Sequence, residues 1–243
     1  MICEGSTKLK KSSSLLLITS LFFSTFLTFK TFKKVNFHNI TIYGSKLFSI
    51  DDIAINSSLN LPTPLIFVKT KYHEKELKKN LSLKNVSIYR QIFPFGLKIQ
   101  IKTRTPIAYG ERIFKGEKLS GFIDEHGFFI NEKFSEKENL GNLSTKVYGW
   151  EENFRITLSE IFKSQKNNNI EFVTINFSPN GFLTLEEKGL KTILLGFDPT
   201  IIETQLRIIC DLKNQLTGEN ILEKIDNIDL TDPNNPKIKV FKP

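Results

Sequence analysis

An uncharged run from Ser12 to Phe29 constrains this 243-residue chain more than any other feature. Lysines flank the run on both sides, at positions 8, 10 and 11 before it and 30, 33 and 34 after it. A helix rises about 1.5 Å per residue and a hydrocarbon core is about 30 Å thick, so this run is close to the minimum length for one crossing. We therefore expect a short tail at 1–11, a transmembrane anchor at 12–29, and a long part outside the membrane.

The same run could instead be a cleaved signal peptide or a buried core helix. A cleavage site needs small residues after the apolar stretch. No Ala follows Leu21 before Ala54, and bulky Phe residues recur as far as Phe32. These observations favour an uncleaved signal anchor. The lysines are balanced across the run, so they do not set its orientation. The long C-terminal part after a single N-terminal anchor favours a cytoplasmic N-terminus and an exported remainder.

Charge divides the remaining chain in two. Residues 35–106 contain 11 basic and 4 acidic side chains, a balance of +7, whereas residues 107–243 contain 17 and 21, a balance of −4. We therefore expect a domain boundary near Pro106. The basic surface beside the membrane could be simply solvated, or it could contact anionic lipid headgroups or an acidic partner. An exported domain rarely meets nucleic acid and no aromatic-basic binding motif is present, so no nucleic-acid partner is expected.

Hydrophobic periodicity in the first domain predicts the order β-α-α-β-β. Ser49 and Asp52 are spaced as a capping box that opens the first helix. Alternation from Leu97 to Arg104 is typical of a strand with one buried face. The two C-terminal strands form a hairpin, and the first strand must join their sheet to bury its apolar face. The result is an α+β layer. The predicted elements are strand 40–44, helices 53–59 and 72–81, and strands 86–90 and 97–104.

The second domain is predicted to be mostly antiparallel β structure with two helices. Apolar residues at helical spacing indicate a helix over 154–162 and another after Pro199. Turn residues separate short apolar runs that are typical of hairpins. The stretch that follows Ile130 and ends at residues 147–150 is interpreted as rich in loops. The predicted strands are an apolar one that ends at Ile130, after the 122–127 segment, and then 170–177, 182–185, 190–195, 225–230 and 237–240.

Asp124, Glu125 and His126 are the only cluster of residues that suggests chemistry. They could be a metal or acid–base site, but consecutive residues cannot all converge on one atom, and Gly127 favours a turn. The sequence contains no nucleophile elbow, phosphate-binding glycine loop or metal-ligand set. We therefore expect no enzyme activity, no cofactor and no small-molecule substrate.

Several motifs, in this order, resemble the cell-division family FtsQ/DivIB, whose signal anchor is followed by a POTRA domain and a β domain. In the first domain the strand ending at Gly44 and the two helices are followed by Val86…Arg90…Pro94…Leu97-x-Ile99-x-Ile101 and Arg104-Thr-Pro106-Ile-Ala108. The family usually has Glu-Arg-x-Pro-Val-Ala at the latter place, so the acidic first position is absent. In the second domain the similar motifs are Phe122-Ile-Asp-Glu-His-Gly127 and Ile228-Asp-Leu230. Thr231 stands where the family often has a basic residue.

The resemblance implies a bitopic scaffold of the bacterial division machinery in the cytoplasmic membrane, with periplasmic domains and enrichment at the septum. The POTRA region would help to place the protein there. The last strands would bind coiled-coil partners like FtsB and FtsL and so link cytoplasmic ring proteins to septal peptidoglycan synthases. The partner-binding residues expected from this resemblance are Asp229, Leu230, Thr231, Asp232, Lys237, Ile238, Lys239 and Val240.

Two questions stay open at this stage. Lysines at 237, 239 and 242 could protect an exposed strand edge against aggregation, or they could steer an acidic partner. The alternative function is a POTRA-type chaperone or assembly factor of the cell envelope. Such proteins usually carry several POTRA repeats or a barrel, and neither is predicted here. An exported enzyme would depend on residues 124–126 alone.

Overall fold

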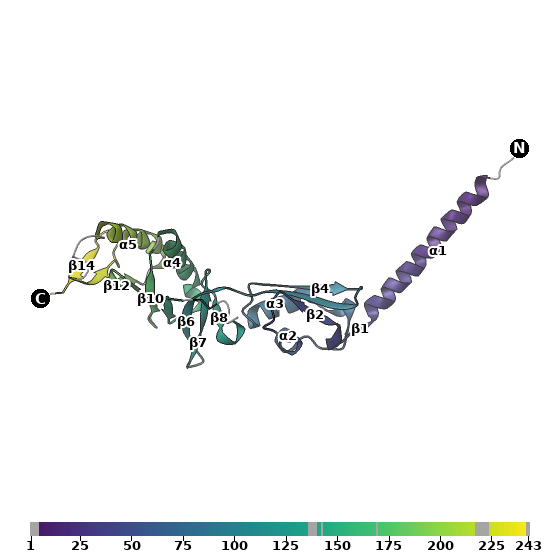
Figure 1. Cartoon of the computed structure of the whole chain (residues 1–243), viewed down its shortest axis with the longest axis horizontal. Coiled ribbons are helices and arrows are strands. Elements are labelled where there is room, and N and C mark those ends of the chain that lie inside the picture. Colours follow the sequence, from purple (N-terminus) through teal and green to yellow (C-terminus); the bar gives the residue numbers. More distant parts are fainter. Residues whose placement is uncertain (1–4, 136–139, 142, 169, 217–223, 242–243) are drawn as a thin grey trace. The chain divides into compact units, whose positions relative to one another are not determined.

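The computed structural model describes residues 5–135, 140–141, 143–168, 170–216 and 224–241. The chain divides into two compact units, 1–103 and 104–243. The first unit begins with α1 (Gly5–Phe32), drawn in purple in Figure 1. Within it, Leu15–Phe32 is long and apolar enough to cross a membrane. Residues 1–4 of the expected tail lie outside the described part, and the helix already includes residues 5–11.

The rest of the first unit is a three-stranded sheet with two helices. Its sheet order is β2-β5-β4, in which β2 is parallel and β4 antiparallel to β5. This confirms the predicted β-α-α-β-β order and places the first strand in the sheet of the hairpin (Figure 1). The main elements are β2 (Ile40–Tyr43), α2 (Ile50–Ser57), α3 (Thr70–Asn80), β4 (Asn85–Gln91) and β5 (Gly96–Lys102). Short elements precede or separate them: β1 (Lys34–Val35), η1 (Phe37–Asn39), β3 (Thr63–Pro64) and η2 (Leu65–Phe67).

Local sequence explains these elements. The Ser49 hydroxyl accepts the Asp52 N–H at 3.1 Å, and the Asp52 carboxylate accepts the Ser49 N–H at 2.9 Å, which completes the predicted capping box of α2. Hydrogen bonds from the Ser49 side chain and backbone lower the pKa of Asp52. In β5 the alternate residues Leu97, Ile99 and Ile101 are buried, as the period-two pattern predicts.

In the described part of the second unit, nine strands form one mixed sheet with the order β14-β13-β12-β11-β10-β9-β6-β7-β8. Most neighbours are antiparallel, but β9 is parallel to both β6 and β10, and β13 is parallel to β12. The strands are β6 (Pro106–Phe114), β7 (Glu117–Asp124), β8 (Phe129–Asn131), β9 (Lys146–Tyr148), β10 (Phe172–Phe177), β11 (Leu183–Glu187), β12 (Lys191–Gly196), β13 (Ile225–Asp229) and β14 (Lys237–Val240). The short helical turns are η3 (Glu132–Phe134), η5 (Glu152–Phe154) and η6 (Pro199–Ile201).

Two helices cover one face of this sheet. α4 (Arg155–Asn168) connects β9 to β10, and α5 (Ile202–Leu216) connects β12 to β13. Each connection joins parallel neighbours, which requires a crossover and therefore places a helix on the sheet. Figure 1 shows both helices on the same side of the strands. Their inner residues, including Leu158, Ile161, Leu206 and Ile209, form a continuous core with the sheet.

β6 and most of β7, at the start of the second unit, were not predicted from the sequence. In β6 the buried positions are Pro106, Ala108 and Gly110, whereas the larger Ile107 and Tyr109 are exposed. This is the reverse of the usual pattern, so hydrophobic alternation gives no signal there. The loop-rich interpretation of Val147 and Tyr148 was wrong, because they belong to β9 in the middle of the sheet. A strand of three residues is too short to show a period.

Candidate partner-binding site

The expected partner-binding residues lie at one end of the nine-stranded sheet. β14 pairs with β13 in an antiparallel register that opposes Asp229 to Lys237 and Ile228 to Ile238. No other described strand pairs with β14, so it is the edge strand. An edge strand presents backbone groups on its outer side that can pair with another chain.

The orientation of these backbone groups follows from the ladder. The Phe241 N–H donates to the Lys224 carbonyl at 2.8 Å, so Phe241 directs its backbone groups toward β13. Successive residues of an antiparallel strand direct these groups to alternate sides. The irregularity in this ladder skips a residue of β13, between Ile225 and Asn227, and leaves β14 continuous. Ile238 and Val240 therefore direct their N–H and C=O groups outward.

The side chains of the same two residues are apolar and accessible. Directly opposed residues share a face of the sheet. Ile238 opposes Ile228 and Val240 opposes Ile225, and both partners are completely buried on the helix side. Yet Ile238 is 42% exposed and Val240 is 51% exposed. The apolar face of the sheet thus continues one strand beyond the part that the core covers.

The opposite face of β14 is basic. Lys237 and Lys239 oppose Asp229 and Asn227, and the Lys239 ammonium lies 3.3 Å from the Asp226 carboxylate. Both lysines are exposed. The edge strand therefore offers a donor–acceptor ladder, an apolar strip on one face and positive charge on the other.

The segment between the two strands is held by its own side chains. The Asp229 carboxylate accepts hydrogen bonds from the Thr231 hydroxyl at 2.7 Å and the Thr231 N–H at 3.0 Å, and these lower the pKa of Asp229. Asp232 is exposed and accepts the Asn234 N–H at 3.0 Å. Leu230 is fully buried and its carbonyl accepts a hydrogen bond from Gln205, so its side chain is not available to a partner.

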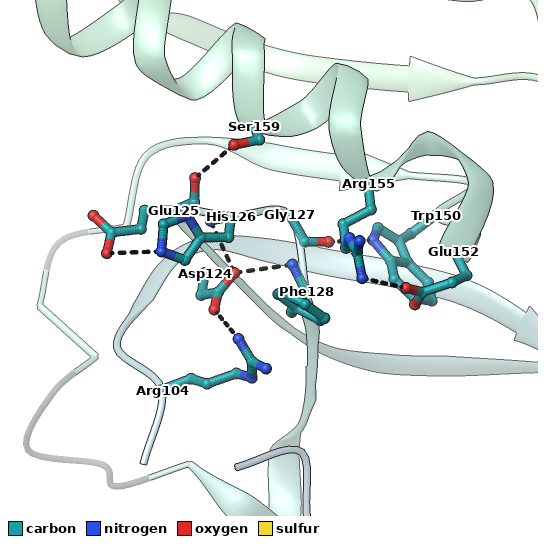
Figure 2. A network of polar contacts seen from close by, with 10 residues as sticks. All are labelled: Arg104, Asp124, Glu125, His126, Gly127, Phe128, Trp150, Glu152, Arg155 and Ser159. Atoms are coloured by element: carbon teal, nitrogen blue, oxygen red, sulfur yellow. Dashed lines mark hydrogen bonds and ion pairs between the residues drawn. The ribbon is translucent and has the colours of Figure 1, made fainter. Parts of the chain in front are cut away.

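Asp124, Glu125 and His126 form a turn, as predicted. The Gly127 N–H donates to the Asp124 carbonyl at 2.9 Å. One oxygen of the Asp124 carboxylate accepts the N–H groups of His126 and Phe128, and the other accepts Arg104 at 2.6 Å (Figure 2). Both oxygens are therefore engaged in structure. Glu125 and His126 point away from Asp124 and are about half exposed.

The same turn is connected to the start of α4. The ring of Phe128 lies between two guanidinium groups, with Arg104 at 3.8 Å and Arg155 at 4.3 Å from its centroid. The Trp150 indole N–H donates to the Gly127 carbonyl at 2.8 Å, and Arg155 pairs with Glu152 (Figure 2). Sequence reasoning noted Arg104 and Asp124 in separate motifs but did not predict that they form one buried ion pair.

Comparison with known proteins identifies the first unit. Residues 35–104 match the family profile described as POTRA domain, FtsQ-type. This chain contains an FtsQ-type POTRA domain. The match points to the FtsQ/DivIB family of cell-division proteins, as the motifs indicated. A search of curated proteins finds no match to the chain.

The FtsQ-type POTRA domain belongs to a non-catalytic family. Among the described residues, no group of three or more His, Cys, Asp and Glu is arranged to hold a metal ion. Cys210 is half-buried on α5, its thiol donates to the Leu206 carbonyl, and burial raises its pKa. A thiol with a raised pKa is a poor nucleophile at neutral pH. The most distinctive accessible feature outside the POTRA domain is the β14 edge.

Proposed function

We propose that this chain is a single-pass membrane scaffold of the bacterial division machinery. The observation that carries the proposal is an FtsQ-type POTRA domain placed directly after a helix that is apolar and long enough to cross a membrane. In this arrangement α1 lies in the cytoplasmic membrane with its N-terminus in the cytoplasm. The POTRA domain and the nine-stranded sheet of the second unit are periplasmic, and the protein is enriched at the septum.

The scaffold acts by binding, with no bond made or broken. The β14 edge accepts a strand from a coiled-coil division protein of the FtsB or FtsL kind by β-augmentation. The outward backbone groups of Ile238 and Val240 supply the hydrogen bonds. Their side chains supply apolar contact, and Lys237 and Lys239 attract acidic groups on the partner. The segment that leads into this edge is held by the hydrogen bonds between Asp229 and Thr231, and Asp232 follows directly after them.

The proposal is tested by the position of the protein in its own cell. A copy labelled at its N-terminus, which leaves the periplasmic edge free, is expected to form a band at midcell during constriction. Depletion of the protein is expected to block division. A uniform envelope signal together with normal division on depletion would overturn the proposal, and would favour a POTRA-type assembly factor.

A further inference from the structure

Exposed aromatic and apolar side chains gather where the POTRA domain meets α1. We call this group the aromatic end; it consists of the exposed Phe37 on η1, Ile66 and Phe67 on η2, and Phe93 in the turn between β4 and β5, together with the half-buried Phe95 of the same turn. Phe93 is 67% exposed and Phe67 is 62% exposed, whereas most large apolar residues of this domain are buried. A cluster of large exposed apolar side chains indicates a contact surface.

Backbone hydrogen bonds hold this surface at the end of the apolar helix. The Leu65 N–H donates to the carbonyl of Lys33, the residue directly after α1, at 3.1 Å. β1 then pairs with β3, which opposes Val35 to Thr63. Because η2 begins at Leu65, Ile66 and Phe67 cannot move away from the end of the helix without breaking these bonds.

Ring contacts continue the aromatic end onto the helix itself. Phe93 stacks on Phe26 with 6.0 Å between ring centroids, and Phe67 meets Phe32 edge to face at 6.2 Å. Phe26 lies six residues before the end of α1, and this distance corresponds to about 9 Å along a helix. A side chain at the level of Phe26 is below the water boundary whenever Leu15–Phe32 crosses a bilayer.

Lysines are interleaved with these rings. The Lys30 ammonium lies 5.5 Å from the Phe26 centroid and 5.8 Å from the Phe93 centroid. The Lys33 ammonium lies 5.1 Å from the Phe95 centroid. Aromatic rings beside lysines at the end of an apolar helix suit the membrane interface, where the rings enter the headgroup region and the ammonium groups meet lipid phosphates.

We propose that the aromatic end of the POTRA domain inserts into the outer leaflet of the same bilayer that α1 crosses. The occupant of this surface is therefore lipid: headgroup phosphates around Lys30 and Lys33, and upper acyl chains around Phe67 and Phe93. The inference rests on α1 spanning the membrane, which is part of the proposed function. It adds that η2, through Phe67, and the turn between β4 and β5, through Phe93, also hold the POTRA domain against the bilayer.

The test places tryptophans in the full chain, reconstituted in vesicles of phosphatidylethanolamine and phosphatidylglycerol with or without bromine on the acyl chains. Phe93→Trp and Phe67→Trp report on the aromatic end. Phe22→Trp, in the middle of α1, reports on the anchor. Tyr43→Trp is the matched control, because Tyr43 is an exposed aromatic residue at the other end of β2. The wild type contains a single tryptophan, the buried Trp150, and sets the baseline.

We expect the added emission of Phe93→Trp and Phe67→Trp to shift to shorter wavelength and to be largely lost in brominated vesicles. Tyr43→Trp should keep its emission. If the first two variants behave like Tyr43→Trp while Phe22→Trp is quenched, the lipid contact is overturned and the anchor stands. If Phe22→Trp also escapes quenching, the spanning helix and the inference both fail. Circular dichroism of each variant verifies that it is folded.

Discussion

Two buried carboxylates, on Asp124 and Glu187, each hold a turn of the nine-stranded sheet by accepting hydrogen bonds from its backbone. Asp124 accepts two backbone N–H groups and Arg104. Glu187 accepts the N–H groups of Gly189 and Leu190 on one oxygen and Lys213 at 2.7 Å on the other. In each case the charge is buried only where a cation and a turn backbone both compensate it, which is the condition for a tolerable buried ion.

Removing one partner of such a pair leaves the other charge uncompensated. We therefore expect Asp124→Ala to lower the free energy of unfolding of the second unit by about 3–5 kcal/mol. The measurement is urea unfolding of the full chain in detergent micelles, followed by the fluorescence of Trp150, which lies in the core of that unit. Glu125→Ala removes a neighbouring carboxylate that is half exposed and should change little. Equal stability of the two variants would contradict the structural role of the pair.

At the scale of elements, β14 differs from the strands that precede it. Both residues that oppose its apolar side are in the core, but β14 itself is exposed along its whole length. Its inner backbone groups are used by β13 and its outer ones are free of any described strand. β14 is therefore held in the sheet by β13 on one side, and its other side can pair with a strand from a partner.

This difference gives a specific test of the proposed docking mode. Ile238→Pro removes an outward N–H that β13 does not use, so partner capture by FtsB-like or FtsL-like proteins should be lost while the sheet remains folded. Ile238→Val keeps the N–H and a β-branched side chain and should capture the partner nearly as the wild type does. Affinity pull-down from solubilised membranes measures both. Undiminished capture by a folded Ile238→Pro protein would rule out strand addition at this edge.

At the scale of the whole chain, the two compact units differ in charge and in their relation to the membrane. The first carries the apolar helix, the FtsQ-type POTRA domain and a net charge of +11, whereas the whole chain has +8 because the second unit is net −3. The second has an acidic balance, but Lys237 and Lys239 make one face of its last strand basic. A positive first unit is suited to a bilayer with anionic lipid, and the edge strand of the second is suited to an acidic partner.

An uncleaved anchor predicts that the mature protein keeps residues 12–29 and stays in the membrane during alkaline extraction. The physical reason is that no small-residue site follows the apolar run. Mass spectrometry of the membrane fraction measures this. As a positive control, Thr31→Ala combined with Lys33→Ala creates an Ala-x-Ala pattern after the apolar run and should introduce cleavage. Cleavage of this variant shows that the signal peptidase of the cell is active on the chain. A shortened wild-type chain in the soluble fraction would exclude the anchor.

The α+β order of the first unit could be predicted because its elements have strong local signals. The capping box at Ser49 and the alternation of Leu97, Ile99 and Ile101 depend on neighbouring residues alone, and both are confirmed. The turn at Asp124 was predicted for the same reason. The apolar helix likewise follows from composition over one continuous stretch.

Only the tertiary structure decided the rest, because those features depend on residues far apart in the chain. β6 places small residues inward, and β9 is a strand only because β6 and β10 pair with it on both sides. The Arg104–Asp124 pair joins two motifs that the sequence keeps separate. The final strands were predicted as strands with an exposed edge, but which strand lies at the end of the sheet depends on the order of all the other strands, which only the tertiary structure gives.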